Sequence, residues 1–425
     1  MRPNEPVLLI CHGFPPVRGI GGRRWAKFAK ELARRGHPVH VIRSTTAPGA
    51  SASLWTGDAV HPLIHHHPLP KRFPAVMSKR PLLSLKDQVL YKLWSLVLPL
   101  LGKGNWLDAT LLWRRPLLAE ASKLIKQHGI RQVIATGAPF RVLAYGAELK
   151  QRFPQVRLVI DLRDEWTWAG HYGLGTMGPR RQEQERNLEA TAIRTADKVV
   201  SPHAKVLAHL ERAYPDSARN CTLLPHAVDP DDVDLSIKPK TGGVFRMIYA
   251  GSLYGEKEAG HYFTKLMEAL EALRQQRPEL IAHFRFDLYI TGRGTDWYQQ
   301  QAAARGWQEQ VVFHAPLPPR EALKQVRGSN LAVLFIPAVN KDILGTKFQE
   351  IFYTGTPMLH IGEPGLVSRT IRERRMGDSL RVEELVAELP RIIAGERKVE
   401  CDRTADHGAY LLPNLTDRLI NEVLT

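Results

Sequence analysis

Residues 7–42 decide the fold and read VLLICHGFPPVRGIGGRRWAKFAKELARRGHPVHVI. The apolar run at 7–12 predicts a buried strand, and a loop rich in glycine and proline follows at 13–22. Residues 23–35 place apolar side chains on one face at helical spacing, and Gly36 ends this helix before a second strand at 39–42. A strand, loop, helix and strand in this order form a unit with parallel strands and a right-handed crossover. The passage therefore predicts an α/β protein.

The same order of elements begins again in the second half of the chain. After a proline-interrupted passage at 225–243, the sequence predicts a strand at 245–250, a polar loop, a helix at 261–273 and a strand at 286–290. Two successive Rossmann-like halves are therefore expected, and in such sheets ligands bind at the carboxyl ends of the strands. Further strands are predicted at 132–135, 157–161, 198–201, 311–314 and 331–336, and helices at 117–128 and 183–195.

Positive charge is concentrated in the first third of the chain. The whole chain has 59 Lys and Arg against 43 Asp and Glu, a net charge of +16. Residues 1–150 contain 23 basic and 7 acidic side chains, whereas residues 151–425 contain 36 of each. This regional field suits an anionic partner, which is a membrane surface, a nucleic acid or a phosphorylated substrate.

Several classes of protein are disfavoured by the sequence. The three cysteines are widely spaced, so they form neither a disulfide framework nor a zinc pattern, and they suit a reducing compartment. The first residues do not resemble a secretory signal. Charged residues and a proline interrupt the longest apolar stretch, residues 82–101, so we expect no membrane-spanning helix.

The glycine-rich loop after the first strand is a candidate anion site. Glycines allow close approach of the backbone, and the following helix begins with free N–H groups and the positive end of its dipole. Arginines in the loop add charge, so a phosphate or another anion is the expected guest; the alternative is a solvated surface loop. The candidate residues are Arg18, Gly19, Gly21, Gly22 and Arg23.

A second candidate site is the motif at 342–358, which reads DILGTKFQEIFYTGTPM. Gly345 and Thr346 can open a short helix, which we expect to end at Gly355 before a proline. Lys347 and Glu350 are three residues apart and share a helix face. A helix N-terminus, a cation and a carboxylate suit a nucleoside diphosphate, with the first two on phosphate oxygens and the carboxylate on ribose hydroxyls. The alternative is an ordinary surface ion pair.

This motif resembles the donor-site motif of the family-4 retaining glycosyltransferases of the GT-B fold. There an acidic residue, seven intervening residues and a Glu are combined with a Lys three residues before that Glu. Asp342, Lys347 and Glu350 have this spacing, although the family usually has Glu at the first position. The glycine loop, the segment DLRDEW at 161–166 and the segment LPHAVD at 224–229 resemble the same family, so the resemblance covers essentially the whole chain.

The resemblance implies an α/β, GT-B architecture of two Rossmann-like domains whose parallel sheets face each other across a cleft. Residues 1–228 would form the acceptor domain, with a basic amphipathic insertion near 71–103. Residues 244–404 would form the domain that binds the nucleotide-sugar donor. Residues 405–425 would form a C-terminal helix that packs back toward the N-terminal domain.

The resemblance also implies roles for single residues. Asp342 would contact hydroxyls of the donor sugar, Lys347 the diphosphate and Glu350 the ribose, and the glycine loop would lie near the acceptor and the diphosphate. Many relatives have an Arg where this chain has Ser252, and we expect Arg293 to restore that charge. The remaining donor-binding candidates are Gly251, Lys257, Gly292, Gly345 and Thr346.

Three polar residues at strand ends are candidates on the acceptor side. His12 ends the first strand and is expected either to orient the acceptor or to have a structural role. Asp161 and Arg163, with Asp164, end another strand, where they would orient acceptor hydroxyls or pair with each other.

The expected reaction needs no protein nucleophile and no metal. Positive groups at the departing diphosphate are the main means of stabilising the transition state, and no carboxylate pair is placed in the glycosidase manner. The resemblance implies that the acceptor attacks the face from which the diphosphate leaves and that the diphosphate takes the proton. We expect no cofactor besides the nucleotide-sugar substrate.

Two further stretches allow two interpretations each. The run His65-His66-His67 contains metal-binding residues, but three adjacent residues cannot all face one ion, so we expect a loop or a strand end. Residues 82–101 form a basic, aromatic-bearing amphipathic stretch, which either lies in a membrane interface or packs on its own domain. Both interpretations can hold for different residues of one helix.

The sequence therefore predicts a hexosyl- or N-acetylhexosaminyltransferase that moves sugar, with retention, to a lipid-linked or polysaccharide acceptor in bacterial-type cell-surface polysaccharide biosynthesis. We expect it to be cytoplasmic and peripheral at the inner face of the cytoplasmic membrane, on an anionic surface, and to bind no nucleic acid. The alternative within the fold is a nucleotide-sugar epimerase or a phosphorylase-like enzyme. A nucleic-acid-binding protein that uses the basic N-terminal domain is the more distant alternative.

Overall fold

The computed structural model describes residues 4–46, 49, 51–79, 81, 84–168, 172–238, 242–253, 256–291 and 295–425, without the side chains of 256–259. The chain divides into two compact units. The first contains residues 1–225 together with 412–425, and the second contains residues 226–411.

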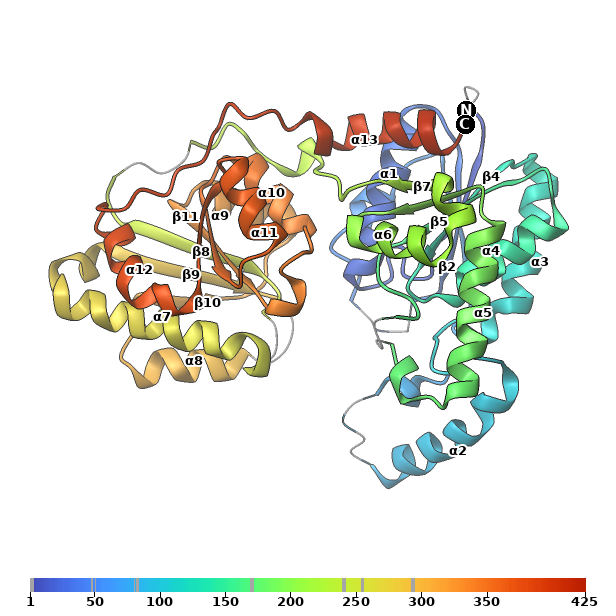
Figure 1. The fold of residues 1–425 in the computed structure, drawn as a ribbon, viewed down its shortest axis with the longest axis horizontal. Coiled ribbons are helices and arrows are strands. Elements are labelled where there is room, and N and C mark those ends of the chain that lie inside the picture. The colour runs from blue at the N-terminus through green and yellow to red at the C-terminus, as the bar shows by residue number, and fades with distance from the viewer. Residues whose placement is uncertain are drawn as a thin grey trace. The chain divides into compact units, whose positions relative to one another are not determined.

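The first unit is built on a seven-stranded sheet in which every neighbouring pair of strands is parallel (Figure 1). The strand order is β3-β2-β1-β4-β5-β6-β7, so the order reverses between β1 and β4. The strands are β1 Val7–Ile10, β2 Val39–Ser44, β3 Ile64–Leu69, β4 Gln132–Gly137, β5 Arg157–Leu162, β6 Lys198–Ser201 and β7 Cys221–Leu223.

Helices cover both faces of this sheet. Alternate residues of β5, such as Leu158 and Ile160, join a buried apolar cluster with α3, α4 and α5. The other residues of β5 face away from that cluster, and Asp161 among them contacts Trp25 of α1, which places α1 on the opposite face. The helices are α1 Arg23–Arg34, α2 Leu85–Leu101, α3 Arg114–His128, α4 Arg141–Arg152, α5 Pro179–Thr195, α6 Ala204–Ala213 and α13 Leu412–Arg418.

The C-terminal segment belongs to the first unit although it follows the second in sequence. Helix α13 packs against α1, and both Leu415 in this helix and Leu419 directly after it are fully buried. Arg35, at the end of α1, donates from Nη2 to the backbone oxygen of Pro413 at 2.7 Å and forms an ion pair with Asp417. The first unit is therefore assembled from both ends of the chain.

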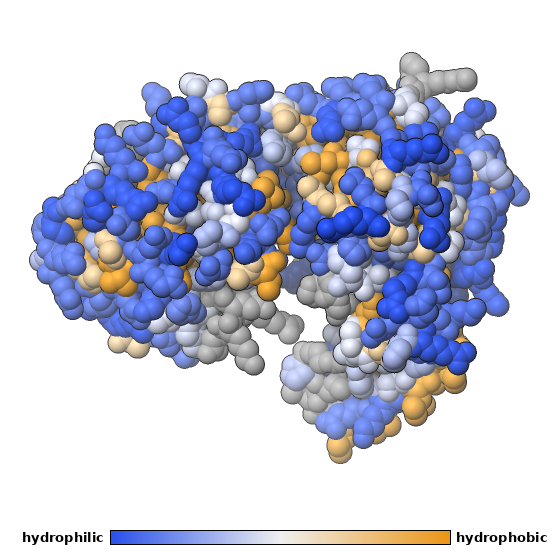
Figure 2. Space-filling view, in the orientation of Figure 1, coloured by the Kyte–Doolittle hydropathy of each residue, from blue (hydrophilic) through white to orange (hydrophobic). Residues whose placement is uncertain are grey.

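Helix α2 lies at one end of the first unit, away from its sheet (Figure 1). The side chain of Ser84 accepts a hydrogen bond from the N–H of Asp87 at 3.0 Å and caps the N-terminus of the helix. Hydrophobic residues are visible along the outer side of this segment (Figure 2). Within the described residues, no helix combines the length and the apolar character needed to cross a membrane.

The second unit repeats the architecture with six parallel strands (Figure 1). The strand order is β10-β9-β8-β11-β12-β13, so the order reverses between β8 and β11. The strands are β8 Phe245–Gly251, β9 Phe284–Ile290, β10 Val311–His314, β11 Leu331–Ile336, β12 Met358–Gly362 and β13 Gly377–Leu380.

Two apolar clusters occupy the two faces of the second sheet. One joins the sheet to α7, α8 and α12, and the other joins it to α9, α10 and α11. The helices are α7 Glu256–Gln276, α8 Thr295–Ala304, α9 Pro319–Arg327, α10 Thr346–Thr354, α11 Leu366–Glu373 and α12 Leu385–Ile393. Both units are thus doubly wound α/β layers, which confirms the predicted fold class.

One sequence prediction about secondary structure was wrong. His65, His66 and His67 are not in a loop or at a strand end but lie inside β3, an edge strand that pairs along its length with β2. Successive side chains of a strand point to opposite faces. His65 and His67 therefore stack on His40 of β2, while His66 contacts Phe14.

Candidate functional site

The candidate site of the second unit lies where the strand order reverses. In open parallel sheets ligands bind outside the carboxyl ends of the strands at such a point. Strand β8 ends there at Gly251, and the chain leaving the neighbouring β11 runs to α10. The predicted motif residues Lys347 and Glu350 therefore arise from the helix that follows the central strand.

Helix α10 begins and ends where the sequence predicts. Gly345 is the residue before its first turn, Thr346 is its first residue, and Gly355 terminates it in the left-handed conformation, with φ 70°. Phe348, Ile351 and Phe352 are buried and fasten one face of the helix to the core. Because the buried face fixes the rotation of α10, Lys347 and Glu350 occupy set positions.

The ammonium of Lys347 lies against the end of β8. It sits 4.8 Å from the ring centroid of Tyr249, and a Cβ atom at Gly251 would overlap its Nζ and Cε atoms. Gly251 also has φ 138°, a conformation that other residues rarely adopt. The backbone conformation therefore favours glycine at 251, and a side chain there would displace the end of Lys347.

Short hydrogen bonds join the ends of β8 and β9 beside Lys347. The hydroxyl of Tyr249 donates to the backbone oxygen of Ser252 at 2.6 Å. The hydroxyls of Ser252 and Thr291 lie 2.9 Å apart, and the N–H of Thr291 donates to the oxygen of Gly251 at 3.0 Å. Tyr249 and Thr291 were not singled out from the sequence, although their positions at strand ends were the available signal.

The electrostatics of this site centre on Lys347. Burial lowers the pKa of its ammonium to about 8, while the nearby carboxylate of Glu350 acts in the opposite direction. The ammonium is thus charged at neutral pH but less firmly than an exposed lysine. A cation poised in this way can stabilise an anionic group brought to the end of β8.

Asp342 has a structural partner that the sequence did not indicate. Its Oδ1 accepts a hydrogen bond of 2.7 Å from the N–H of Leu366, the first residue of α11, and so satisfies a free donor of that helix. The N–H of Val367 donates to the oxygen of Lys341 at 3.0 Å. The segment that carries Asp342 is therefore tied to the N-terminus of α11.

Three predicted donor-site residues lie wholly or partly outside the described part of the chain. Gly292 and Arg293 lie outside the described residues. Lys257 belongs to the first turn of α7, but its side chain lies outside the described part as well.

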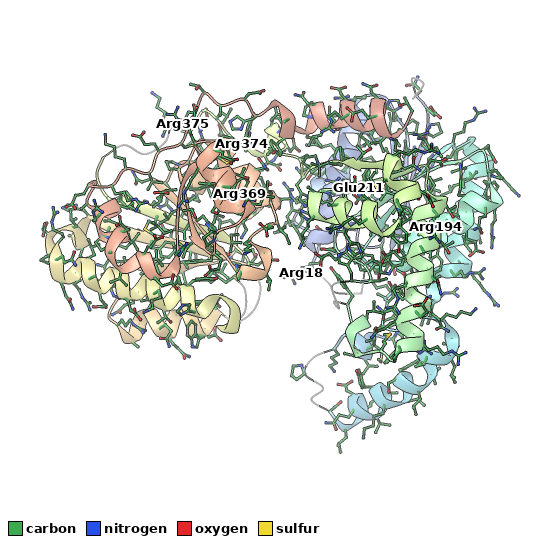
Figure 3. The ribbon with its side chains drawn as sticks, in the orientation of Figure 1. Arg18, Arg194, Glu211, Arg369, Arg374 and Arg375 are labelled. Atoms are coloured by element: carbon green, nitrogen blue, oxygen red, sulfur yellow. The ribbon has the colours of Figure 1, made fainter. Side chains whose placement is uncertain are left out.

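In the first unit, the glycine loop is closely packed against itself. A Cβ atom at Gly22 would overlap the backbone oxygen of Gly13, so only glycine fits there. Gly19 has φ 132°, and the exposed Arg18 precedes it (Figure 3). Residues Ile20–Gly22 form a short 3-10 turn that leads into α1, whose first residue, Arg23, is buried.

Asp161 is a buried structural group of the first unit. Its carboxylate accepts from Trp25 Nε1 at 2.7 Å, from Thr136 Oγ1 at 2.7 Å and from Arg24 Nε at 3.2 Å. Arg24 is itself buried, and its remaining donors reach the backbone oxygens of Leu224 and Pro225 at 2.7 Å each. This arrangement favours a structural role, with Arg24 and not Arg163 as the partner of Asp161.

Arg163 fastens the glycine loop to the turn after β4. It donates to the backbone oxygens of Gly137 and Ala138 at 2.8 Å each, and to that of Gly21. His12 packs edge-on against Trp113 with 4.8 Å between ring centroids, and burial lowers its pKa to about 4. His12 is therefore neutral at pH 7.

Two buried carboxylates on α5 were missed by the sequence analysis. Glu185 accepts from Asn105 N at 2.7 Å and from Trp166 Nε1 at 2.8 Å. Glu189 accepts from the N–H of Thr167 at 3.0 Å, and burial raises its pKa to about 7. The available sequence signal was their spacing. Glu185 and Glu189 are four residues apart on the helix face that continues with Ala192 and Ile193.

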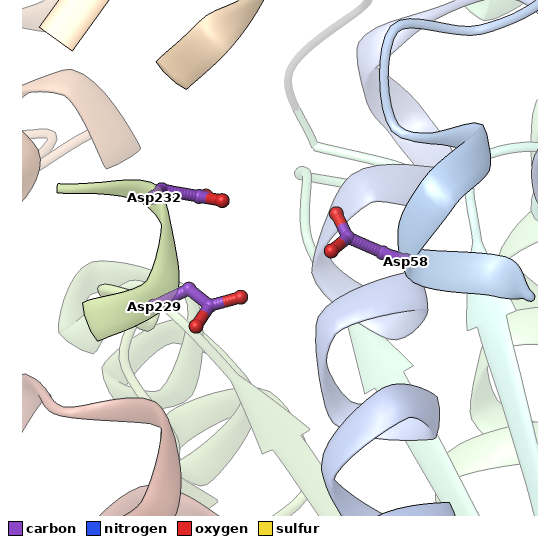
Figure 4. Close-up of side chains that lie close together, drawn as sticks. All are labelled: Asp58, Asp229 and Asp232. Atoms are coloured by element: carbon purple, nitrogen blue, oxygen red, sulfur yellow. The ribbon is translucent and has the colours of Figure 1, made fainter. Parts of the chain in front are cut away.

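Other polar groupings of the second unit lie elsewhere. A shallow hollow of about 470 Å³ is lined by residues that include Arg372, Arg375 and Lys398, at the amino end of β13 and so away from the carboxyl ends of the strands. Arg375 follows α11, which carries Arg369 (Figure 3). Asp229 and Asp232 lie on one short turn (Figure 4), where Asp232 forms an ion pair with Arg320.

Comparisons with known proteins agree with this architecture. No protein-family model matches the chain, and no curated protein matches it. Among solved structures, sucrose-phosphate synthase from Thermosynechococcus elongatus is 14% identical with a TM-score of 0.57, over 98% of this chain and 94% of that one. WaaG, a glycosyltransferase involved in lipopolysaccharide biosynthesis, is 13% identical with a TM-score of 0.53, over 98% and 96% of the two chains.

A third structure broadens the functional range of these neighbours. A protein from Listeria monocytogenes, provisionally described as a UDP-N-acetylglucosamine 2-epimerase, is 13% identical with a TM-score of 0.55, over 98% and 94% of the two chains. At such identities the likeness shows the fold alone. With its two doubly wound parallel sheets, the chain has the GT-B fold, as predicted.

Proposed function

We propose that this protein is a retaining glycosyltransferase of the family-4 type, which transfers a hexosyl or N-acetylhexosaminyl group from a nucleotide-sugar donor. The second unit binds the donor, and the first unit binds a lipid-linked or polysaccharide acceptor of a bacterial-type surface polysaccharide. The enzyme works without a metal and without nucleic acid, in the cytoplasm at the inner face of the membrane.

One observation carries this proposal. The ammonium of Lys347 lies against Gly251 at the carboxyl end of β8. A diphosphate placed there meets a partly desolvated cation, whose attraction is stronger than in water. Glu350 lies one helical turn from Lys347 on the same face of α10. It is therefore the candidate partner of the ribose hydroxyls.

The proposed chemistry is the one that the resemblance to the retaining glycosyltransferases implies. The acceptor oxygen bonds to the anomeric carbon as the bond from that carbon to the diphosphate oxygen breaks, and the diphosphate takes the acceptor proton. Lys347 stabilises the negative charge that grows on the leaving diphosphate. Asp161 and Asp342 each accept a hydrogen bond from another part of the protein. The proposal therefore gives these two residues a positioning role.

The test is a Lys347→Met variant, which keeps an unbranched side chain at this position and removes the charge. Nucleoside diphosphates and nucleotide sugars are screened by thermal shift, and turnover is measured with the donor that stabilises the wild type. We expect turnover to fall by roughly 10²-fold or more. The melting temperature of Lys347→Met without ligand should change little, because burial of the Lys347 charge does not stabilise the fold.

The matched control is Lys265→Met. Lys265 forms an i,i+3 ion pair with Glu268 at 2.6 Å on α7, so it repeats the spacing of Lys347 and Glu350 away from the candidate site. Donor binding and turnover should be unchanged in this control. Full donor-dependent turnover in Lys347→Met would contradict the proposal.

Epimerisation is the second candidate function, favoured by the similarity to the Listeria protein. An epimerase acts on the nucleotide sugar alone, whereas a transferase needs an acceptor. Incubation of the donor without acceptor, followed by analysis of the sugar, separates the two. An inverted sugar still attached to its nucleotide would assign the protein to the epimerases.

A further inference from the structure

Helix α2 packs on the first unit through only one of its apolar faces. Leu98 is fully buried, and Tyr91 and Trp94 pack beside it against a small cluster that contains Val76 and Met77. This contact fixes the rotation of α2 about its own axis. The opposite face is therefore presented outward by the fold and not by a chance orientation of side chains.

The outward face is a continuous apolar stripe. Six of the thirteen exposed large apolar side chains in the described part of the chain belong to this one helix. Five of them are 52% to 85% exposed and follow one another at spacings of three or four residues: Leu85, Val89, Leu93, Leu96 and Leu100. Scattered exposed leucines are ordinary, whereas a contiguous stripe marks a surface that contacts something.

Basic residues border this stripe on both sides. At 100° per residue, the five side chains occupy an arc of about 80° on the helix. The exposed Lys86 and Lys92 lie about 20° beyond its two edges. The one acidic residue of α2, Asp87, already forms an ion pair with Lys79. An apolar arc between two lysines suits a surface that is apolar inside and anionic at its boundary.

The segments on both sides of α2 extend this positive border. Lys71 and Arg72 are exposed before the helix, and Lys103 is exposed after it. A second copy of the chain is a poor occupant, because a symmetric pair of α2 helices would place the lysines of both copies around one contact. An anionic phospholipid surface satisfies the leucines and the lysines together.

We propose that α2 docks the protein on an anionic bilayer. The helix lies in the plane of the interface, with the leucine face in the acyl boundary and Lys86 and Lys92 at the level of the headgroup phosphates. This deepens the proposed function, on which it rests for the presence of a lipid-linked acceptor. The docking face itself is independent of the donor site and can be tested without it.

The experiment is flotation of the full-length protein with phosphatidylcholine vesicles, with and without phosphatidylglycerol. We expect the wild type to float with the anionic vesicles and the double variant Leu96→Gln/Leu100→Gln to lose at least about tenfold in partitioning. The double variant Lys86→Gln/Lys92→Gln should lose the part of the binding that added salt removes from the wild type.

A matched control replaces two exposed leucines outside α2, Leu54 and Leu235, with Gln. This control should float like the wild type. Failure of the wild type to float, or equal flotation of the α2 leucine variant, would overturn the proposal. A wild-type dimer that stays off both vesicles and dissociates on the α2 leucine substitutions would assign the face to a second copy and overturn it too.

Thermal shift with nucleoside diphosphate, in the absence of vesicles, separates this proposal from the proposed function. Stabilisation by the nucleotide in a protein that does not float would refute the docking face alone. Flotation without any nucleotide stabilisation would refute the donor site alone.

Discussion

The loop after β1 and the loop after β8 occupy the same place in two copies of one architecture, yet the cations beside these loops are used differently. In the first unit, Arg24 and Arg163 direct their donors to backbone oxygens and to Asp161. In the second unit, the ammonium of Lys347 rests on a glycine and an aromatic ring. Positive charge thus fastens backbone segments in the first unit, whereas in the second unit we propose that it binds a ligand.

The glycines of the two loops also differ in which atoms lie where a side chain would be. Gly22 is required because the backbone oxygen of Gly13 occupies the space of a side chain. At Gly251 the positive φ favours glycine, whereas the space of a side chain is occupied only by the flexible end of Lys347. A backbone atom cannot move aside at low cost, whereas the end of a lysine can.

The largest effect is expected from Asp161→Ala in the first unit. Removing this carboxylate leaves Arg24, Trp25 and Thr136 without their buried acceptor, so the free energy of unfolding should fall by about 3–5 kcal/mol. Urea unfolding followed by circular dichroism measures the loss. A loss below about 1 kcal/mol would mean that Asp161 is a ligand group and not a structural one.

The two glycines supply an intermediate effect. Gly22→Ala should lower the free energy of unfolding by about 3 kcal/mol, because its clash is with the backbone. Gly251→Ala should lose at least about tenfold in nucleotide affinity, because it displaces the ammonium of Lys347 from the end of β8. Calorimetric titration with the nucleotide found in the thermal-shift screen measures that affinity.

The folding cost of Gly251→Ala should be smaller than that of Gly22→Ala, since only backbone strain of about 1–3 kcal/mol opposes it. If both variants lost stability equally and the Gly251 variant still bound nucleotide normally, the contrast between the two loops would be lost.

The smallest effect is a pH dependence of the second unit. Burial places the pKa of Lys347 at about 8, so the ammonium loses its charge as the pH rises through that value. Nucleotide affinity should therefore be nearly constant below pH 7 and fall by about tenfold by pH 9. Isothermal titration across this range measures the midpoint.

Glu350→Gln sharpens this test, because the Glu350 carboxylate raises the pKa of Lys347. Without it, the midpoint should move to lower pH, whatever the substitution does to the affinity itself. A midpoint that stays in place would show that Glu350 does not act on Lys347.

Local signals explain what the sequence could predict. The bounds of helix α10 were predicted correctly because local residues signal them. Gly345 and Thr346 mark its start, and Gly355 marks its end. The buried parallel strands β1, β4, β5, β8 and β11 were found because their apolar runs are continuous. The face shared by Lys347 and Glu350 likewise follows from spacing alone.

What the sequence could not predict depends on residues far apart in the chain. Strands β12 and β13 were not predicted, because His360 interrupts the apolar run of β12 and β13 contains polar residues. The pairing of these two strands brings His360 Nδ1 and Ser379 Oγ to 2.8 Å. Asp161, in β5, has charged neighbours in sequence, but its partner Arg24 comes from the distant helix α1. The cap that Asp342 gives to Leu366 is equally non-local.

The position of residues 412–425 has a consequence for biosynthesis. Leu415 and Leu419 complete the packing beside α1, yet a ribosome adds them only after the whole second unit has been made. The nascent first unit must therefore wait with part of its α1 surface uncovered while the second unit folds. During that interval the growing chain offers chaperones a hydrophobic surface that the finished protein no longer has.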